Sequence, residues 1–242
     1  MLFAEWRLVF TGAADGYVNM AIDEATLVLV GEGRVPPTVR VYRWDRPCYT
    51  VGYLQRISTH SRAMLRGGAC IRRLTGGQAC LHGGDLSYSI VVSLVDTLIP
   101  SDVIASYERI SFGVIEGLRL LGVDARYAPP AAIRVDEHTI GTAGQARQRG
   151  VLLHQGTIAL KSCGIDGAPV LPCETLVPLS DVAGGETGFS NVAEALAMGF
   201  ERALGVDLSR SGLYAKEKRL ARQLLREKYK RSEWNLAHLE QP

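Results

Sequence analysis

Residues 70–89 read Cys-Ile-Arg-Arg-Leu-Thr-Gly-Gly-Gln-Ala-Cys-Leu-His-Gly-Gly-Asp-Leu-Ser-Tyr-Ser, with two arginines before a Thr-Gly-Gly turn and a histidine after it. An apolar run follows at residues 90–92, so the pattern predicts a polar loop between two β-strands. Glycines let the backbone adopt positive φ angles and approach a ligand closely. Arg72 and Arg73 each offer a planar guanidinium that suits a carboxylate or a phosphate. The stretch therefore predicts an anion-holding loop, and an ordinary hairpin with surface arginines is the alternative.

Around this loop, strand and helix patterns are mixed without a strict βαβ alternation. Short apolar or alternating runs predict strands at 6–10, 38–44, 49–53, 86–94, 124–127, 133–135 and 151–160. Helical spacing and capping residues predict helices at 17–30, 58–65, 101–121, 191–204 and 214–229. Ser101 is the expected cap of the third helix, and Asn191 with Glu194 resembles a capping box for the fourth. The mixture predicts an α+β (mixed α/β) protein in which residues 1–242 form a single domain and 205–242 a basic helical C-terminal segment.

Composition narrows the class of protein. The chain has 242 residues, 47% of them hydrophobic, which is enough for a substantial core. A formal net charge of +2 disfavours a nucleic-acid partner, which usually meets a strongly basic face. Neither a secretory signal nor a membrane-length apolar run is visible, so we expect a cytoplasmic protein without a membrane partner. The five cysteines form no C-x-x-C pair, which argues against a disulfide framework and against a zinc site.

Three further segments contain short motifs of polar, aromatic and glycine residues. They are residues 19–25 (Asn-Met-Ala-Ile-Asp-Glu-Ala), residues 44–47 (Trp-Asp-Arg-Pro) with 51–55 (Val-Gly-Tyr-Leu-Gln), and residues 141–158. Together with residues 70–89 they resemble the motifs of the lipoate-protein ligase A/octanoyltransferase family, above all the octanoyltransferases related to lipoate ligases. The resemblance extends to residues 232–235 and covers nearly the whole chain. It implies a catalytic domain like those of class II aminoacyl-tRNA synthetases and biotin-protein ligases, with a mixed β-sheet flanked by helices.

The resemblance also implies an activity, which is the attachment of a lipoyl or octanoyl group to a lysine of a carrier domain. The implied partners are an octanoyl or lipoyl donor and a lipoyl or acyl carrier protein domain, such as the glycine-cleavage H protein or a 2-oxoacid dehydrogenase lipoyl domain. Transferases of this kind use a cysteine, whereas ligases use ATP and Mg²⁺ to form an acyl-adenylate. The implied substrate-binding residues are Arg72, Arg73, Thr75, Gly76, Gly77, His82, Gln145, His154 and Gly156.

Two positions depart from the family pattern. Thr139 stands where the resembled family has its lysine, and residues 127–138 form a short loop without the transferase cysteine. A threonine hydroxyl donates one hydrogen bond but supplies no cation. The missing charge could come from Arg134, Arg147 or Arg149, and Cys80 could replace the nucleophile, although a buried structural thiol is the more common case. The remaining alternative is a non-catalytic acyl- or carrier-binding relative, or one subunit of a two-chain ligase, with His82 and His154 as pocket or core residues rather than general bases.

Charged residues near the two ends have simpler readings. Asp23 and Glu24 are expected to form a solvated pair on the first helix, because carboxylates prefer the surface. Between Lys216 and Glu233 the chain has eight Lys or Arg against three Glu. Such a run is usually a solvated helical face, and the alternative is a docking face for an acidic partner.

Overall fold

A mixed sheet of eight strands forms the centre of the protein, in the order β11-β1-β2-β6-β10-β9-β8-β7. The computed structural model describes residues 5–57, 69–96, 98–164, 175–183 and 187–236. The strands are β1 (Glu5–Ala14), β2 (Thr38–Trp44), β6 (Asp85–Ser93), β7 (Ala125–Ala128), β8 (Ala132–Val135), β9 (His138–Gln148), β10 (Val151–Ala159) and β11 (Asp207–Ser211). β1 pairs in parallel with β2 and β11. Every other neighbouring pair in this sheet, from β2-β6 to β8-β7, is antiparallel. The predicted α+β class with a mixed sheet is therefore confirmed.

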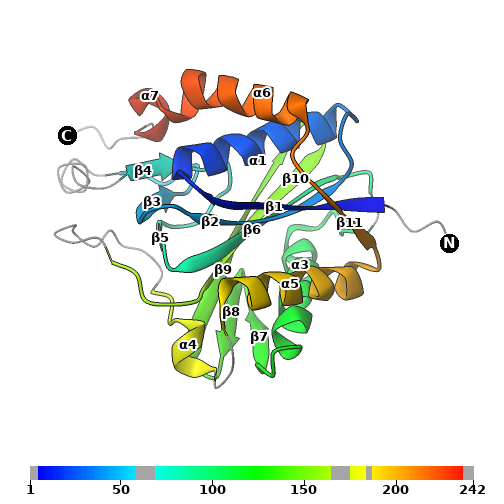
Figure 1. The fold of residues 1–242 in the computed structure, drawn as a ribbon, viewed down its shortest axis with the longest axis vertical. Coiled ribbons are helices and arrows are strands. Elements are labelled where there is room, and N and C mark those ends of the chain that lie inside the picture. The colour runs from blue at the N-terminus through cyan, green and yellow to red at the C-terminus, as the bar shows by residue number, and fades with distance from the viewer. Residues whose placement is uncertain (1–4, 58–68, 97, 165–174, 184–186, 237–242) are drawn as a thin grey trace.

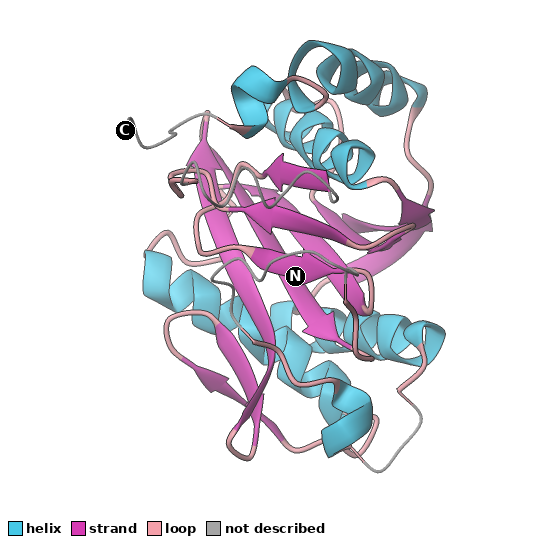
Figure 2. Ribbon diagram, turned by 90° about the vertical axis from the view of Figure 1, so that its left-hand side faces the viewer, coloured by secondary structure: helices cyan, strands magenta, loops and turns pink. Residues whose placement is uncertain are grey.

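Helices cover both faces of this sheet (Figures 1 and 2). The long helices are α1 (Gly16–Gly31), α3 (Val103–Arg119), α5 (Phe189–Leu204) and α6 (Ala215–Leu224), and the short ones are α4 (Leu179–Val182), the π-helix η2 (Leu225–Tyr229) and α7 (Ser232–Asn235). α3 and α5 share one hydrophobic core with the sheet, while α1 packs on the opposite face beneath α6. Because both faces are covered, every residue of β10 is buried, and all but the last of β6. None of the described helices combines the length and the apolar character needed to cross a membrane.

A second sheet of three strands carries the arginine-glycine turn. Its order is β4-β3-β5, with bounds Ala69–Arg72, Cys48–Val51 and Cys80–His82. β3 runs parallel to β4 and antiparallel to β5, so the turn at residues 73–79 passes from one side of β3 to the other. The Gly76 amide donates to the Gln145 carbonyl at 3.2 Å. This bond fastens the turn to β9 of the large sheet.

Several local predictions were wrong or incomplete. Asp102, rather than Ser101, caps α3 by accepting a hydrogen bond from the Ala105 amide. α5 begins at Phe189 after Gly188, so Asn191 and Glu194 lie inside the helix and form no capping box. Strand β11 and the short helix α4 were not among the predicted elements. The predicted helix at 58–65 lies outside the described residues.

The predicted solvated pair on the first helix was wrong. Asp23 is 1% exposed and accepts a hydrogen bond from Arg40 Nη1 at 2.7 Å. Glu24 is half-buried and binds Lys228 and Tyr229 of the C-terminal region. Sequence periodicity could not reveal these partners, because they come from β2 and from a helix about two hundred residues away.

The C-terminal basic run is mostly exposed. A buried ion pair between Arg7 and Glu217 (2.7 Å) fixes α6 to β1 of the large sheet. Lys216 and Lys228 are half-buried and bind Arg34 O and Glu24. The exposed cations of the run are Lys218, Arg219, Arg222, Arg226, Lys230 and Arg231.

Candidate functional site

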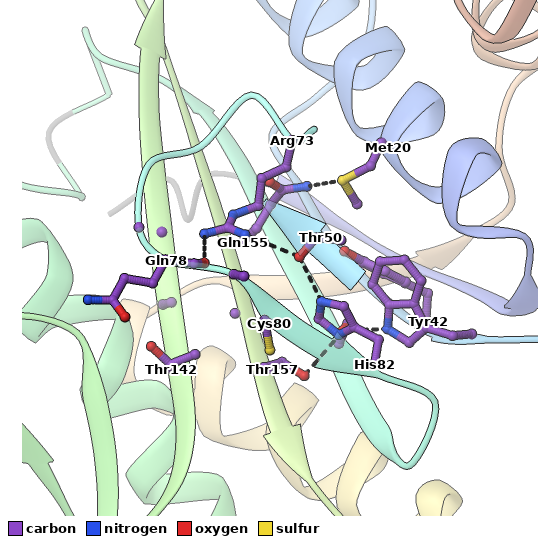
Figure 3. A pocket seen from close by; sticks show the side chains of 17 residues that line it. Met20, Tyr42, Thr50, Arg73, Gln78, Cys80, His82, Thr142, Gln155 and Thr157 are labelled. Carbon is purple, nitrogen blue, oxygen red and sulfur yellow. Dashed lines mark hydrogen bonds between the residues drawn. The ribbon is translucent and has the colours of Figure 1, made fainter. Parts of the chain in front are cut away.

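A cleft of about 510 Å³, a value that includes its open mouth, lies between the arginine-glycine turn and the large sheet. Its walls come from α1, from both sheets and from the turn (Figure 3). The apolar part of the lining comprises Met20, Tyr42, Trp44, Ala79, Ala143 and the glycines Gly77, Gly144 and Gly156. The polar part comprises Thr50, Arg73, Gln78, Cys80, His82, Ser87, Thr142, Gln155 and Thr157. Apolar walls with a few convergent polar groups are typical of a small-molecule site.

Arg73 organises the turn from inside. Its guanidinium donates to Thr75 Oγ1 (3.1 Å), to Thr50 Oγ1 (3.1 Å) and to the carbonyl oxygens of Gly76 and Gln78 (both 2.8 Å). Gly77 has φ +99°, a conformation that side-chain-bearing residues rarely adopt. The Thr-Gly-Gly sequence therefore permits a loop that wraps around one arginine.

Arg72 points away from the cleft. It is fully buried and donates to three backbone carbonyls, those of Gly52 (2.7 Å), Tyr53 (3.0 Å) and Gln55 (2.8 Å). Adjacent residues at the end of a strand face opposite ways, so only one of the two arginines can reach the cleft. Arg72 thus holds the loop after β3 in place.

His82 and Asp85 form a buried pair at the floor of the cleft. The His82 ring stacks on Trp44 with 4.1 Å between ring centroids, its Nδ1 donates to Asp85 Oδ2 at 2.8 Å, and its Nε2 lies 2.9 Å from Thr50 Oγ1. Burial alone would raise the pKa of Asp85, yet the His82 charge and hydrogen bonds lower it to about 2. Further donors to this carboxylate are Trp44 Nε1, Ser87 Oγ, Thr157 Oγ1 and the Gly83 amide. The network fixes the orientation of the imidazole.

Gln155 joins the turn to α1. Its Oε1 accepts a hydrogen bond from Thr75 Oγ1 at 2.8 Å, and its Nε2 donates to Asp23 Oδ2 at 2.6 Å. Asp23 also accepts from Arg40 and from Ser89 Oγ at 2.8 Å. A chain of buried hydrogen bonds therefore runs from α1 to the arginine-glycine turn.

His154 belongs to the core rather than to the cleft. It is completely buried, and Gln145 Nε2 donates to its Nδ1 at 3.0 Å while Tyr88 Oη lies 3.5 Å from its Nε2. Burial lowers the pKa of His154 to about 3, and the nearby Arg147 charge acts in the same direction. The ring is therefore neutral at physiological pH.

The predicted site residues divide into two groups. Arg73, Gly77, His82 and Gly156 line the cleft, whereas Arg72, Thr75, Gly76, Gln145, His154 and Thr139 support its walls or lie beyond them. Thr139 accepts a hydrogen bond from Arg134 Nε at 3.3 Å. The substrate-binding roles of both groups remain predictions.

None of the three arginines considered as substitutes for the missing lysine lines the cleft. Arg147 binds Gln145 Oε1 (2.8 Å) and Ser106 Oγ (2.7 Å). Arg149 is exposed, with φ +53°, in the turn between β9 and β10. Arg73 is the one Lys or Arg among the described residues that line the cleft.

Sequence reasoning missed several lining residues. Thr50, Ser87, Gln155 and Thr157 are polar residues on strands, and their spacing of two, from 155 to 157, was the available signal. Cys80 was considered only as a less common alternative, yet it also lines the cleft.

The chain matches one known protein family and is similar to several of its members. Residues 15–170 match the model of the lipoyl protein ligase A/B catalytic domain. The octanoyltransferase LipM of Kyrpidia tusciae is 36% identical, with 95% of this chain and 98% of that protein aligned. The alignment runs over 272 positions, 30 more than the 242 residues of this chain, so the relative has positions without a counterpart here.

Two solved lipoate protein ligase structures superpose on this chain over nearly its whole length. A bipartite lipoate protein ligase from Thermoplasma acidophilum, studied with its E2 lipoyl domain, superposes with a TM-score of 0.82 at 25% identity, covering 98% of both chains. A lipoate-protein ligase A bound with ATP gives a TM-score of 0.83 at 26% identity, covering 97% of this chain and 100% of that one.

Proposed function

Because the chain belongs to the lipoyl protein ligase A/B catalytic domain family, we propose that it transfers an octanoyl group from a thioester donor to a lysine of a lipoyl domain. The observation that carries the proposal is the cleft beneath the arginine-glycine turn, with apolar walls and the His82–Asp85 pair at its floor. An eight-carbon chain matches such walls, because each buried methylene group contributes about 0.8 kcal/mol. The carbonyl then lies near the polar floor, where the transfer takes place.

The charges in the cleft favour transfer over ATP-dependent ligation. Arg73, the lining cation, already donates to four oxygen acceptors of its own loop and of Thr50. A triphosphate would need free cations or donors, whereas a thioester brings no charge to be neutralised. ATP with Mg²⁺ would be required only on the ligase route, which the bound ATP of the ligase neighbour illustrates.

The proposed acceptor is a lipoyl domain, by analogy with the neighbour studied with its E2 lipoyl domain. The exposed cations of the C-terminal run would attract an acidic domain over a distance set by salt screening. Raising the ionic strength is therefore expected to increase the KM for the acceptor and to leave kcat unchanged.

An acylation assay tests the proposal. The protein is incubated with an apo lipoyl domain and one of three donors: octanoyl-carrier thioester, octanoate with ATP and Mg²⁺, or lipoate with ATP and Mg²⁺. We expect an octanoyl mass shift on the acceptor lysine with the thioester, and none when that lysine is replaced by arginine. No shift with any donor would overturn the proposal, and a shift only with ATP would replace transfer by ligation.

A variant pair tests the cleft itself. Ala143 lines the cleft on β9, whereas Ala132 is a half-buried alanine of the neighbouring strand β8 outside the lining. Ala143→Leu should raise the KM for octanoyl donors more than for butyryl donors, because the larger side chain occupies the space of the distal methylene groups. Ala132→Leu should leave both unchanged.

A further inference from the structure

Cys80 shares one face of β5 with His82. Successive side chains of a strand point to opposite sides, so residues 80 and 82 point the same way, and both line the cleft. Thr50, the register partner of Cys80 on β3, binds the His82 ring from the same side. Figure 3 shows the side chains of Cys80, Thr50 and His82 near one another in the cleft. A thiol, an imidazole and a carboxylate thus follow one another from the cleft into the core.

From this arrangement we propose that Cys80 is the nucleophile that carries the acyl group, with His82 as its acid and base and Asp85 as the residue that positions His82. The inference deepens the proposed acyl transfer and rests on it. It assigns the covalent step to Cys80, the first residue of β5 after the arginine-glycine turn, whereas the sequence has no cysteine at residues 127–138.

The order of contacts matches that of a nucleophile, a base and an orienting group. His82 Nδ1 is held by Asp85 at 2.8 Å, and its Nε2 lies 2.9 Å from Thr50 Oγ1, whose residue is the register partner of Cys80. Burial opposes protonation of His82, but electrostatic attraction to Cys80 and Asp85 and hydrogen bonding to both raise the pKa of His82 to about 10. A ring that holds a proton beside a sulfur is the arrangement that activates cysteine nucleophiles.

The other described thiols lack these surroundings. Cys48 and Cys70 are buried outside the cleft lining, and burial raises the pKa of Cys48 well above its usual value and that of Cys70 to about 11. Cys163 lines a separate hollow and donates to the His82 carbonyl at 3.6 Å. Burial raises its pKa as well. Cys163 is therefore a suitable control residue.

The chemistry balances without an added cofactor. Cys80 Sγ attacks the carbonyl carbon of the donor thioester, and the bond from that carbon to the donor sulfur breaks. The donor thiol leaves with the proton held by His82. The lysine amine of the acceptor then attacks the Cys80 thioester, an amide bond forms, and the proton lost by the amine passes to His82 as the Cys80 sulfur is released.

Peptide mapping of the intact protein tests the assignment. Residues 74–109 contain no internal Lys or Arg and hold Cys80 as their single cysteine, whereas Cys163 lies in the tryptic peptide 162–202. The protein is mixed with octanoyl-carrier thioester without acceptor, quenched in acid and digested. We expect one octanoyl adduct, on peptide 74–109, and its loss when the apo lipoyl domain is added. An adduct on another peptide, or none while the thioester still supports acceptor acylation, would overturn the inference.

Variants give an independent measurement. Cys80→Ala should lose the adduct and lower kcat for transfer by at least about a hundredfold, whereas Cys163→Ala should retain both. Cys80→Ser serves as the second variant, and thermal unfolding confirms that each protein is folded. Transfer at the wild-type rate by folded Cys80→Ala would refute the role of Cys80 while leaving the proposed function intact. Failure of the wild-type protein to acylate the acceptor from any donor would refute the proposed function.

The positioning role of Asp85 is tested by comparing kcat with KM, because a purely structural role would not change kcat alone. Asp85→Asn should lower kcat with little change in KM, because the amide no longer selects the ring orientation and proton position that His82 needs. Asp85→Glu, which restores the carboxylate, should recover part of kcat. If KM rose as much as kcat fell, and equally for both variants, Asp85 would only maintain the fold.

Discussion

Replacing Asp23 by asparagine tests how strongly the cleft depends on a buried charge. Asp23 and Arg40 are each 1% exposed, and the carboxylate also accepts from Ser89 and Gln155. Removing one partner of a buried ion pair typically costs 3–5 kcal/mol. Arg40 retains bonds to Thr11 and Asn19, so we expect a loss of roughly 3 kcal/mol, near the lower limit of that range. For a chain of this size that corresponds to a decrease in Tm of roughly 6–12 °C.

Glu24 provides the matched control. It is the next residue of α1, but its pair with Lys228 is more accessible, with side chains 15% and 22% exposed. Glu24→Gln should therefore cost about 1 kcal/mol or less. Urea unfolding followed by circular dichroism measures both variants. Equal losses near 1 kcal/mol would refute the argument that burial of the Asp23–Arg40 pair determines the cost.

Three further predictions concern the turn, pH and the C-terminal helix. Gly52→Ala would place a Cβ 1.9 Å from the Gly77 carbonyl oxygen, so it should lower stability by about 1–3 kcal/mol and abolish acyl transfer. Gly76→Ala is the control, because a Cβ at Gly76 meets nothing within 4 Å. Equal unfolding midpoints for the two variants would contradict this. Folded His154 has a pKa of about 3 against 6.5 when unfolded, so the unfolded chain takes up a proton that the native core excludes, and stability should fall as the pH decreases below about 6.5. His154→Gln should flatten this part of the profile. Glu217→Gln removes the partner of buried Arg7 and should speed tryptic cleavage within α6, while exposed Glu227→Gln should not; equal digestion rates would count against it.

The sequence specified the turn better than its surroundings. Residues 70–89 were expected to contain a polar loop before the strand at 86–94, and the loop is present. β5 was not predicted, and β4 and β5 form no hairpin because β3 lies between them. The next strand, β6, belongs to the other sheet, however, and this assignment depends on pairing with β2 and β10. Pairing between distant segments is set by the packing of both faces, which a local pattern does not contain.

Adjacent polar residues show the same limit within the site. The sequence does not distinguish Arg72 from Arg73, or His154 from Gln155, as a cleft residue. Only the second residue of each pair lines the cleft. Alternation along a strand guarantees that neighbours face opposite ways, but it does not say which face is covered by the core. That choice follows from the helices that pack on each side, and it excluded His154 from the cleft.

Ionised groups on both sides explain how the cleft keeps its shape. Asp23 is bound by Arg40 on one side, and Asp85 by His82 on the other, and Gln155 links the first of these pairs to the turn through Thr75. Catalysis demands that reacting groups be held within about 0.5 Å of their productive positions. Because the turn has hydrogen-bonded contacts to β3, β9 and β10, loss of the Asp23 carboxylate should loosen it only at Gln155. Asp23→Asn should therefore raise the activation free energy of transfer by less than it lowers the free energy of unfolding. A direct catalytic role of Asp23 would not produce this difference.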